Sequence, residues 1–241
     1  AFVGANTVYE PAVFNTPTKT MALDAVHREA DGKSRYHLEL HNAYGLEMAR
    51  ASWEGLEDQL DGKRLFLLSR AGYSGLQRYA AKWTGDNVAS WEHLQLNIPM
   101  ALGLAVSGVP MVGADVGGYS RYPDPELFSR WMQAGALLPL YRAHSEKGGP
   151  DREPWTFGAE TESVSRKALE LRYRMLPLWA QLMREQWAYG LPPVRPVSFV
   201  YPQDSAAYEC PANEFMIGDS LLAVPVTASR AESVTVYFPS G

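Results

Sequence analysis

Cysteine is almost absent from this chain of 241 residues, in which Cys210 is the only one. A single cysteine excludes an intrachain disulfide and a metal site built from cysteines alone. The sequence also lacks any run that approaches the roughly 20 apolar residues of a membrane span. Lys and Arg form no cluster, and 27 acidic against 22 basic residues give a formal net charge of −5. A nucleic-acid or anionic-membrane surface is therefore not expected, and a neutral substrate fits better.

The chain contains enough apolar material for a sizeable core, since 46% of its residues are hydrophobic and 12% are aromatic. A chain of this length forms one large domain or one and a half smaller ones. It opens on Ala1 instead of Met, in a stretch that reads as a strand, and it closes just after another such stretch. We therefore expect a fragment of a longer protein.

Short apolar runs alternate with longer helical patterns over most of the chain. We expect strands at residues 65–69, 79–83, 108–113 and 137–141, and helices at 37–60, 88–106, 126–135 and 161–187. Pro99 predicts a kink or a division in the second helix, and Pro177 predicts a kink in the fourth. This alternation is typical of an α/β fold with parallel strands.

The pattern changes after Gly190. Short apolar runs at 214–217, 221–226 and 234–238 are separated by turn residues without helices between them. We therefore expect a first domain over residues 1–190 and the beginning of a small all-β domain over residues 191–241.

A polar side chain of unusual type follows each predicted strand of the first domain. These residues are Arg70, Asp86, Asp115 and His144. The carboxyl ends of parallel strands share one edge, so we expect the four side chains to converge on one cavity. Aromatic residues beside them would suit a sugar pocket, and the candidates are Tyr73, Trp83, Tyr119, Tyr141 and Trp155.

Each of the four positions also has a plain structural explanation. Asp86 precedes a helical pattern and would serve as its N-cap. Asp115 lies in a Gly-Ala-Asp-Val-Gly-Gly segment and would suit a turn. His144 would be a structural histidine, and Arg70 would only pair with a carboxylate. Four successive strands ending in such residues make coincidence a weaker explanation for the set than for any single position.

Several segments spread over nearly the whole chain lie at residues 10–15, 41–45, 69–72, 83–87, 113–119, 142–145, 153–155 and 218–222. Together, and in this order, they resemble the retaining α-glucosidases of glycoside hydrolase family 31. The resemblance implies the second half of a (β/α)8 barrel followed by the start of a β-sandwich domain. It implies no cofactor and no metal, and it implies that the rest of the barrel belongs to the full-length protein.

The resemblance also assigns roles to individual residues. Asp86 matches the general acid/base. Arg70, Asp115 and His144 match residues that hydrogen-bond the hydroxyls of the sugar in the first subsite, and Trp83 and Tyr119 match aromatic walls of the pocket. A retaining glycosidase needs two carboxyl groups about 5 Å apart, one of them a nucleophile.

The nucleophile is where this sequence departs from the family. Counting back from Glu10 and Pro11 places Thr7 at the position where the family has a nucleophilic Asp. A threonine hydroxyl without an adjacent base is a poor nucleophile and carries no charge to stabilise an oxocarbenium-like transition state. Glu10 is the nearby carboxylate that remains, although it matches a different motif position.

These observations predict an α-glucosidase-type hydrolase that cleaves terminal α-linked glucose from an oligosaccharide or glucoside by double displacement. Two alternatives remain open. One is an α-xylosidase or α-glucosyltransferase on the same scaffold. The other is a catalytically inactive sugar-binding or structural fragment, which the threonine at position 7 favours. A half barrel also leaves an open sheet edge and an exposed core face, so we expect the isolated chain to be poorly stable or to associate.

Overall fold

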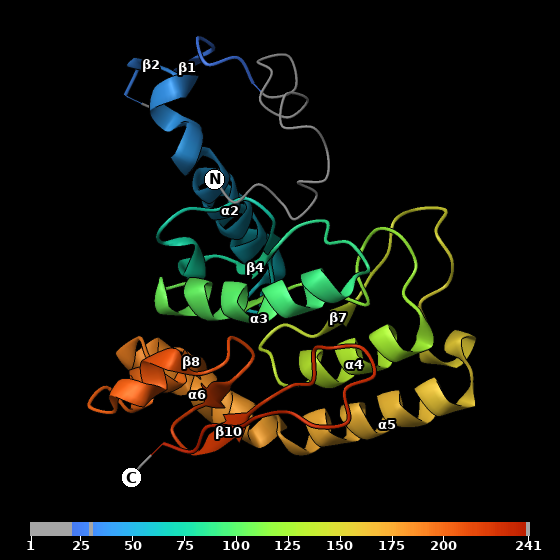
Figure 1. Cartoon of the computed structure of the whole chain (residues 1–241). Coiled ribbons are helices and arrows are strands. Elements are labelled where there is room, and N and C mark those ends of the chain that lie inside the picture. The colour runs from blue at the N-terminus through green and yellow to red at the C-terminus, as the bar shows by residue number, and fades with distance from the viewer. Residues whose placement is uncertain (1–20, 29–30, 240–241) are drawn as a thin grey trace.

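The computed structural model describes residues 21–28 and 31–239 (Figure 1). The parallel strands are β3 (Leu68–Ser69), β4 (Ala81–Trp83), β5 (Val112–Gly113), β6 (Asp115–Val116) and β7 (Arg142–Ala143). They form a three-stranded sheet in the order β3-β4-β5 and a separate pair β6-β7. The described residues form no closed barrel, and this arrangement with its helices is a partial (β/α)8 barrel. The predicted α/β class is thus confirmed.

Helices follow the strands as expected, and the two prolines differ in their effect on helix continuity. The helix α3 (Trp91–Val106) continues through Pro99 as a single helix. Burial of Ile98, Ala101 and Leu102 on its inner face compensates for the hydrogen bond that proline cannot donate. The pattern at 161–187, by contrast, is divided into α5 (Ala159–Arg174) and α6 (Leu176–Tyr189).

The last predicted strand of the series is wrong in position. Residues 137–141 are not a strand, and β7 begins only at Arg142. Pro139 has no N–H to donate, and the Arg172 guanidinium of α5 binds the carbonyl oxygens of Ala136, Leu138 and Pro139. Within the predicted strand, the carbonyls of Leu138 and Pro139 and the nitrogen of Pro139 are therefore unavailable for strand pairing.

A main apolar core joins the helices to the sheets. Its buried side chains include Leu76 from the 3-10 turn η1 (Leu76–Arg78), Ile98 of α3, Val112 of β5 and Trp179 of α6. A second cluster surrounds Phe128 and Trp131 of α4 (Pro125–Gly135). The Asp124 carboxylate caps α4 by accepting from the Leu127 amide at 2.8 Å.

The C-terminal part is an antiparallel sheet in the order β10-β9-β8, from β8 (Val194–Pro196), β9 (Phe215–Ile217) and β10 (Leu221–Ala223). No helix lies between the predicted runs at 214–217, 221–226 and 234–238, as expected, whereas α7 (Val197–Val200) and the 3-10 helix η3 (Ser205–Glu209) lie before them, between β8 and β9. The third of these runs, residues 234–238, does not form a strand. The Tyr237 amide donates to the Glu214 carboxylate at 3.0 Å instead of to a neighbouring strand.

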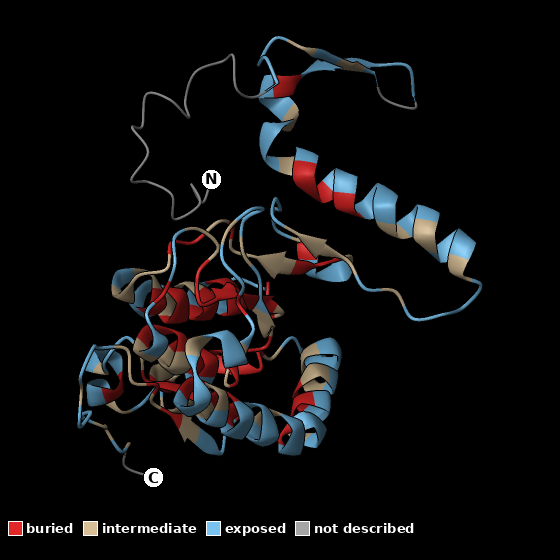
Figure 2. Cartoon of the chain, turned by 90° about the vertical axis from the view of Figure 1, so that its right-hand side faces the viewer, coloured by how far each residue is buried: buried red, intermediate tan, exposed pale blue. Residues whose placement is uncertain are grey.

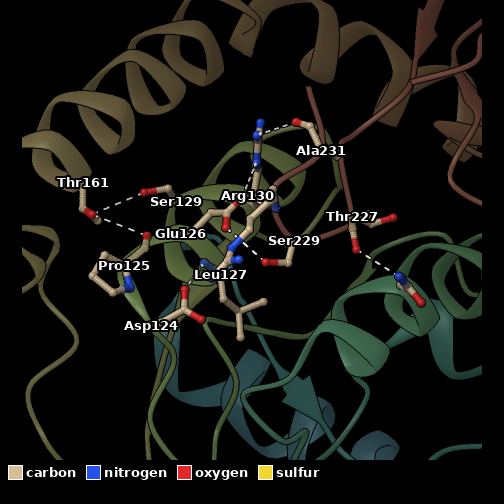
Figure 3. A network of polar contacts seen from close by, with 12 residues as sticks. Asp124, Pro125, Glu126, Leu127, Ser129, Arg130, Thr161, Thr227, Ser229 and Ala231 are labelled. Atoms are coloured by element: carbon tan, nitrogen blue, oxygen red, sulfur yellow. Dashed lines mark hydrogen bonds and ion pairs between the residues drawn. The ribbon is translucent and has the colours of Figure 1, made fainter. Parts of the chain in front are cut away.

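Residues 227–231 bind this C-terminal part to the barrel helices (Figure 3). Glu126 of α4 accepts from the Ser229 hydroxyl at 3.2 Å and from the Arg230 amide at 2.9 Å. Arg130, one turn later, donates to the Ala231 carbonyl at 3.3 Å. The two parts therefore share a polar contact as well as the apolar core.

The N-terminal elements project from the rest of the molecule (Figures 1 and 2). They are the hairpin β1 (Val26–Arg28) with β2 (Ser34–Tyr36) and the helix α2 (His37–Leu60). As predicted, α2 ends before Asp61 and Gly62, which both adopt positive φ. Among the described residues, no helix is long and apolar enough to cross a membrane.

Candidate active site

Asp86 lies in the loop that follows β4, and the structure excludes its explanation as a helix cap. The N-cap of α3 is Ser90, whose hydroxyl accepts from the His93 amide. The Asp86 side chain remains 27% exposed, and its Oδ2 lies 3.9 Å from Nη2 of Arg70. Asp86 is therefore open to a ligand and has a cation beside it.

Asp115 is completely buried and belongs to β6 instead of a turn. Its Oδ2 accepts from the Trp83 indole at 3.0 Å, and its Oδ1 accepts from Nη2 of Arg142 at 2.5 Å. Burial raises the pKa of Asp115, whereas Arg142, His144 and the Trp83 hydrogen bond act in the opposite direction. The carboxylate is thus held in a fixed orientation by one cation and one neutral donor.

The Trp83 ring connects the charged residues with the other aromatic residues. The guanidinium carbons of Arg70 and Arg142 lie 5.8 Å and 5.5 Å from its centroid. The Tyr119 ring lies 6.4 Å away, edge-on, and the His144 ring lies 5.5 Å beyond that of Tyr119. The six predicted site residues of the described chain therefore form one continuous series of contacts. They are Arg70, Trp83, Asp86, Asp115, Tyr119 and His144.

Asn87 joins the loops that carry these side chains. Its buried side-chain amide donates to the Asp115 carbonyl at 3.0 Å and accepts from the Tyr119 amide at 3.1 Å. Its own carbonyl accepts from the amides of Tyr119 and Ser120. The loop after β4 and the loop after β6 are therefore fixed to each other next to Asp86.

Lys82 of β4 supports the backbone of Arg70. Its ammonium donates to the Arg70 carbonyl, and burial lowers the pKa of Lys82. Both residues line a cavity of about 440 Å³ between α2 and β4. This contact fixes the backbone of Arg70 close to the end of β4.

Four other predicted positions are not part of this series of contacts. The Tyr141 hydroxyl donates to the Met132 carbonyl of α4 at 3.0 Å, so its ring packs onto that helix. Trp155 is exposed and lines a separate groove beside α5. Thr7 and Glu10 lie outside the described residues.

Two residues of the site were not singled out from the sequence. Arg142 stands two positions before His144, at the end of the same predicted strand. Its charge at a strand end could have identified it as a site residue. Asn87 gave no such signal, since an Asn after an Asp is ordinary loop composition. In the described part of the chain, no group of three or more His, Cys, Asp or Glu side chains is placed to hold a metal ion.

Two protein-family descriptions match this chain and together cover most of it. Residues 5–182 match "Glycosyl hydrolases family 31 TIM-barrel domain". Residues 190–241 match "Glycosyl hydrolase family 31 C-terminal domain".

Individual glycosidases are also similar to this chain in sequence and structure. Alpha-glucosidase 2 of Bacillus thermoamyloliquefaciens is 44% identical over 98% of this chain and 30% of its own length. A Tris-bound glucosidase II alpha subunit superposes with a TM-score of 0.87 at 37% identity, over 94% of this chain and 24% of that one. An alpha-xylosidase from a soil metagenome, complexed with xylose, has a TM-score of 0.80 at 28% identity, over 87% and 35%. The chain thus spans between 24% and 35% of the length of these three relatives.

Proposed function

The chain belongs to glycoside hydrolase family 31, and from this premise we propose that it supplies the acid/base half of a retaining α-glucosidase site. The observation that supports the proposal is the continuous series of contacts from Arg70 through Trp83 and Asp115 to Tyr119 and His144, with Asp86 at its edge. In this proposal residues 1–190 are barrel and residues 191–241 begin the C-terminal domain.

The proposed roles follow from what each group offers a sugar. Asp86 protonates the leaving oxygen and later removes a proton from water. Asp115 and His144 hydrogen-bond hydroxyls of the first-subsite sugar. Trp83 and Tyr119 present apolar ring surfaces to its C–H faces.

Arg70 contributes a positive charge next to Asp86. Its Nη2 lies 3.9 Å from Oδ2 of Asp86. During the first displacement Asp86 must carry a proton, so we propose that substrate hydroxyls or the nucleophile draw the Arg70 guanidinium away from it.

Thr7 favours a second candidate, in which the chain binds a sugar without turning it over. Hydrolysis by double displacement requires a carboxylate at this position, and threonine supplies none. Glu10 is the alternative nucleophile within the chain. An α-xylosidase or α-glucosyltransferase on the same scaffold is the remaining possibility of the enzyme class.

The deciding experiment measures hydrolysis of an aryl α-glucoside, with the matching α-xyloside in parallel. The chain is joined to the first half of a family 31 barrel, once unchanged and once with Thr7→Asp, Val8→Met and Tyr9→Asn. We expect activity only in the substituted version. Comparable activity in both would assign the nucleophile elsewhere, with Glu10 tested next.

A leaving-group comparison in the active version tests Asp86. We expect Asp86→Asn to reduce hydrolysis of glucosides with poor leaving groups by about 10²–10⁴-fold, because these need protonation. Activated aryl glucosides need little protonation and should lose much less. Equal losses for both substrate types would remove Asp86 from the acid role.

A further inference from the structure

The loop after β6 is wound around a buried guanidinium group. Arg152, in the loop after β7, is 7% exposed. Its Nη1 donates to the carbonyl oxygens of Gly117 at 2.6 Å and Gly118 at 2.5 Å, and its Nη2 donates to the carbonyl of Arg121. One side chain therefore binds three carbonyls within five residues of the neighbouring loop.

Two successive glycines allow the carbonyls to converge. Gly117 and Gly118 have φ of +85° and +82°, a region that side chains disfavour. A Cβ on Gly118 would also lie 2.4 Å from the Ala89 nitrogen. With the carbonyls turned towards Arg152, the amides of Gly118 and Tyr119 point the other way and donate to the carbonyls of Asp115 and Asn87.

We propose that Arg152 is a positioning residue that sets the distance between Tyr119 and His144. Tyr119 lies inside the segment that Arg152 binds, and His144 begins the loop from which Arg152 comes. A second bond between the two loops, from the Glu146 amide to the Tyr119 carbonyl at 3.1 Å, supports the same alignment. The functional meaning of this distance depends on the proposed sugar-binding role of both rings.

The outer side of the same loop has its own support. The Arg152 guanidinium carbon lies 5.8 Å from the Tyr122 ring, which stacks on Phe157 at 5.1 Å. Phe157 in turn stacks on Phe128 of the second core cluster at 4.2 Å. Loss of the guanidinium would therefore loosen residues 117–121 without releasing the end of the loop from the core.

The chain offers a matched control for this arrangement. Arg172 also binds three backbone carbonyls, those of Ala136, Leu138 and Pro139, but these precede β7 and belong to another segment than the loop that carries Tyr119. Substitution of Arg172 therefore also removes a guanidinium that donates to three carbonyls, but it does so outside residues 117–121.

The test is amide hydrogen exchange of the full chain, measured residue by residue for Arg152→Met, Arg152→Lys and Arg172→Met. We expect Arg152→Met to accelerate exchange at Gly118, Tyr119 and Ser120 by roughly tenfold or more, since local opening governs exchange there. Arg152→Lys should restore part of the protection, because an ammonium keeps the charge but not the fork of donors. Arg172→Met should leave these three amides unchanged.

Wild-type rates at the three amides in a folded Arg152→Met chain would overturn the proposal, as would equal acceleration by Arg172→Met. If Arg152→Met does not fold, the exchange rates of the same three amides in Arg152→Lys are compared with wild type, and unchanged rates would overturn the proposal. The affinity of the same proteins for 1-deoxynojirimycin, a glucose-like inhibitor, is also measured. We expect it to be lower in the variants whose amides at residues 118–120 are less protected against exchange. Failure of the wild-type chain to bind it would refute the proposed sugar site, while exchange would still decide the role of Arg152.

Discussion

Trp83 is the residue on which most contacts of the site depend. It donates a hydrogen bond to Asp115, lies under two guanidinium groups and touches Tyr119. A phenylalanine at this position would keep a ring but lose the donor. Loss of the hydrogen bond to the Asp115 carboxylate depends on the charge of that carboxylate. Its effect can therefore be separated by pH from the effect of the smaller ring on packing.

We expect Trp83→Phe to lower the free energy of unfolding by about 1 to 3 kcal/mol at pH 7, since a buried charged acceptor loses a donor. The Trp83 bond lowers the folded-state pKa of Asp115, so its loss raises that pKa further. The unfolded state is unaffected. The difference in free energy of unfolding between the variant and wild type should therefore be largest above the folded-state pKa of Asp115, and it should shrink as pH falls through that pKa.

Urea denaturation across pH 3 to 8 measures this difference. Trp155→Phe is the control, because Trp155 is exposed and lies apart from Asp115. A loss that does not vary with pH would mean that only the packing of the indole matters.

The loops after β4 and β6 hold the site as a pair of elements, and at Gly118 they leave no room for a side chain. Its neighbour is the Ala89 backbone, whose amide donates to the Ser120 carbonyl at 2.9 Å. A side chain at Gly118 would thus separate the two loops as well as strain φ.

We expect Gly118→Ala to lower the free energy of unfolding by roughly 2 to 4 kcal/mol, the sum of φ strain and a backbone collision. Gly148→Ala is the matched control that introduces the φ strain without the backbone collision. Gly148 has the same φ of +82° and no atom within 4 Å of the added Cβ. Thermal or urea unfolding compares the two, and equal losses would show that the loops tolerate separation.

The positions of Asp86 and Asp115 were predictable from the sequence because strand ends follow from short apolar runs and helical spacing. The shift of β7 was not, because the carbonyls of residues 136–139 are bound by Arg172, which lies more than 30 residues away. The same holds for Arg152, whose partners Gly117 and Gly118 belong to another loop. Local patterns carry no information on such distant side-chain to backbone bonds.

At the scale of the whole molecule, the projecting helix α2 is the conspicuous feature (Figure 2). Only a few of its side chains are buried, while Leu38 and Met48 are 66% and 54% exposed. Phe66, between α2 and β3, is 63% exposed. An exposed apolar surface of this kind favours association, which stays a prediction for this chain.

We expect the isolated chain to associate as its concentration rises, and we expect Leu38→Glu with Met48→Glu to reduce this. Both side chains are exposed, so the double substitution should leave the unfolding temperature nearly unchanged while adding charge to the surface. Sedimentation velocity over a concentration series measures the association. Trp187→Glu is the control, since Trp187 is 85% exposed on α6, far along the chain from α2. If Trp187→Glu reduces association as much as the α2 substitutions do, the contact surface is general and α2 is not its centre.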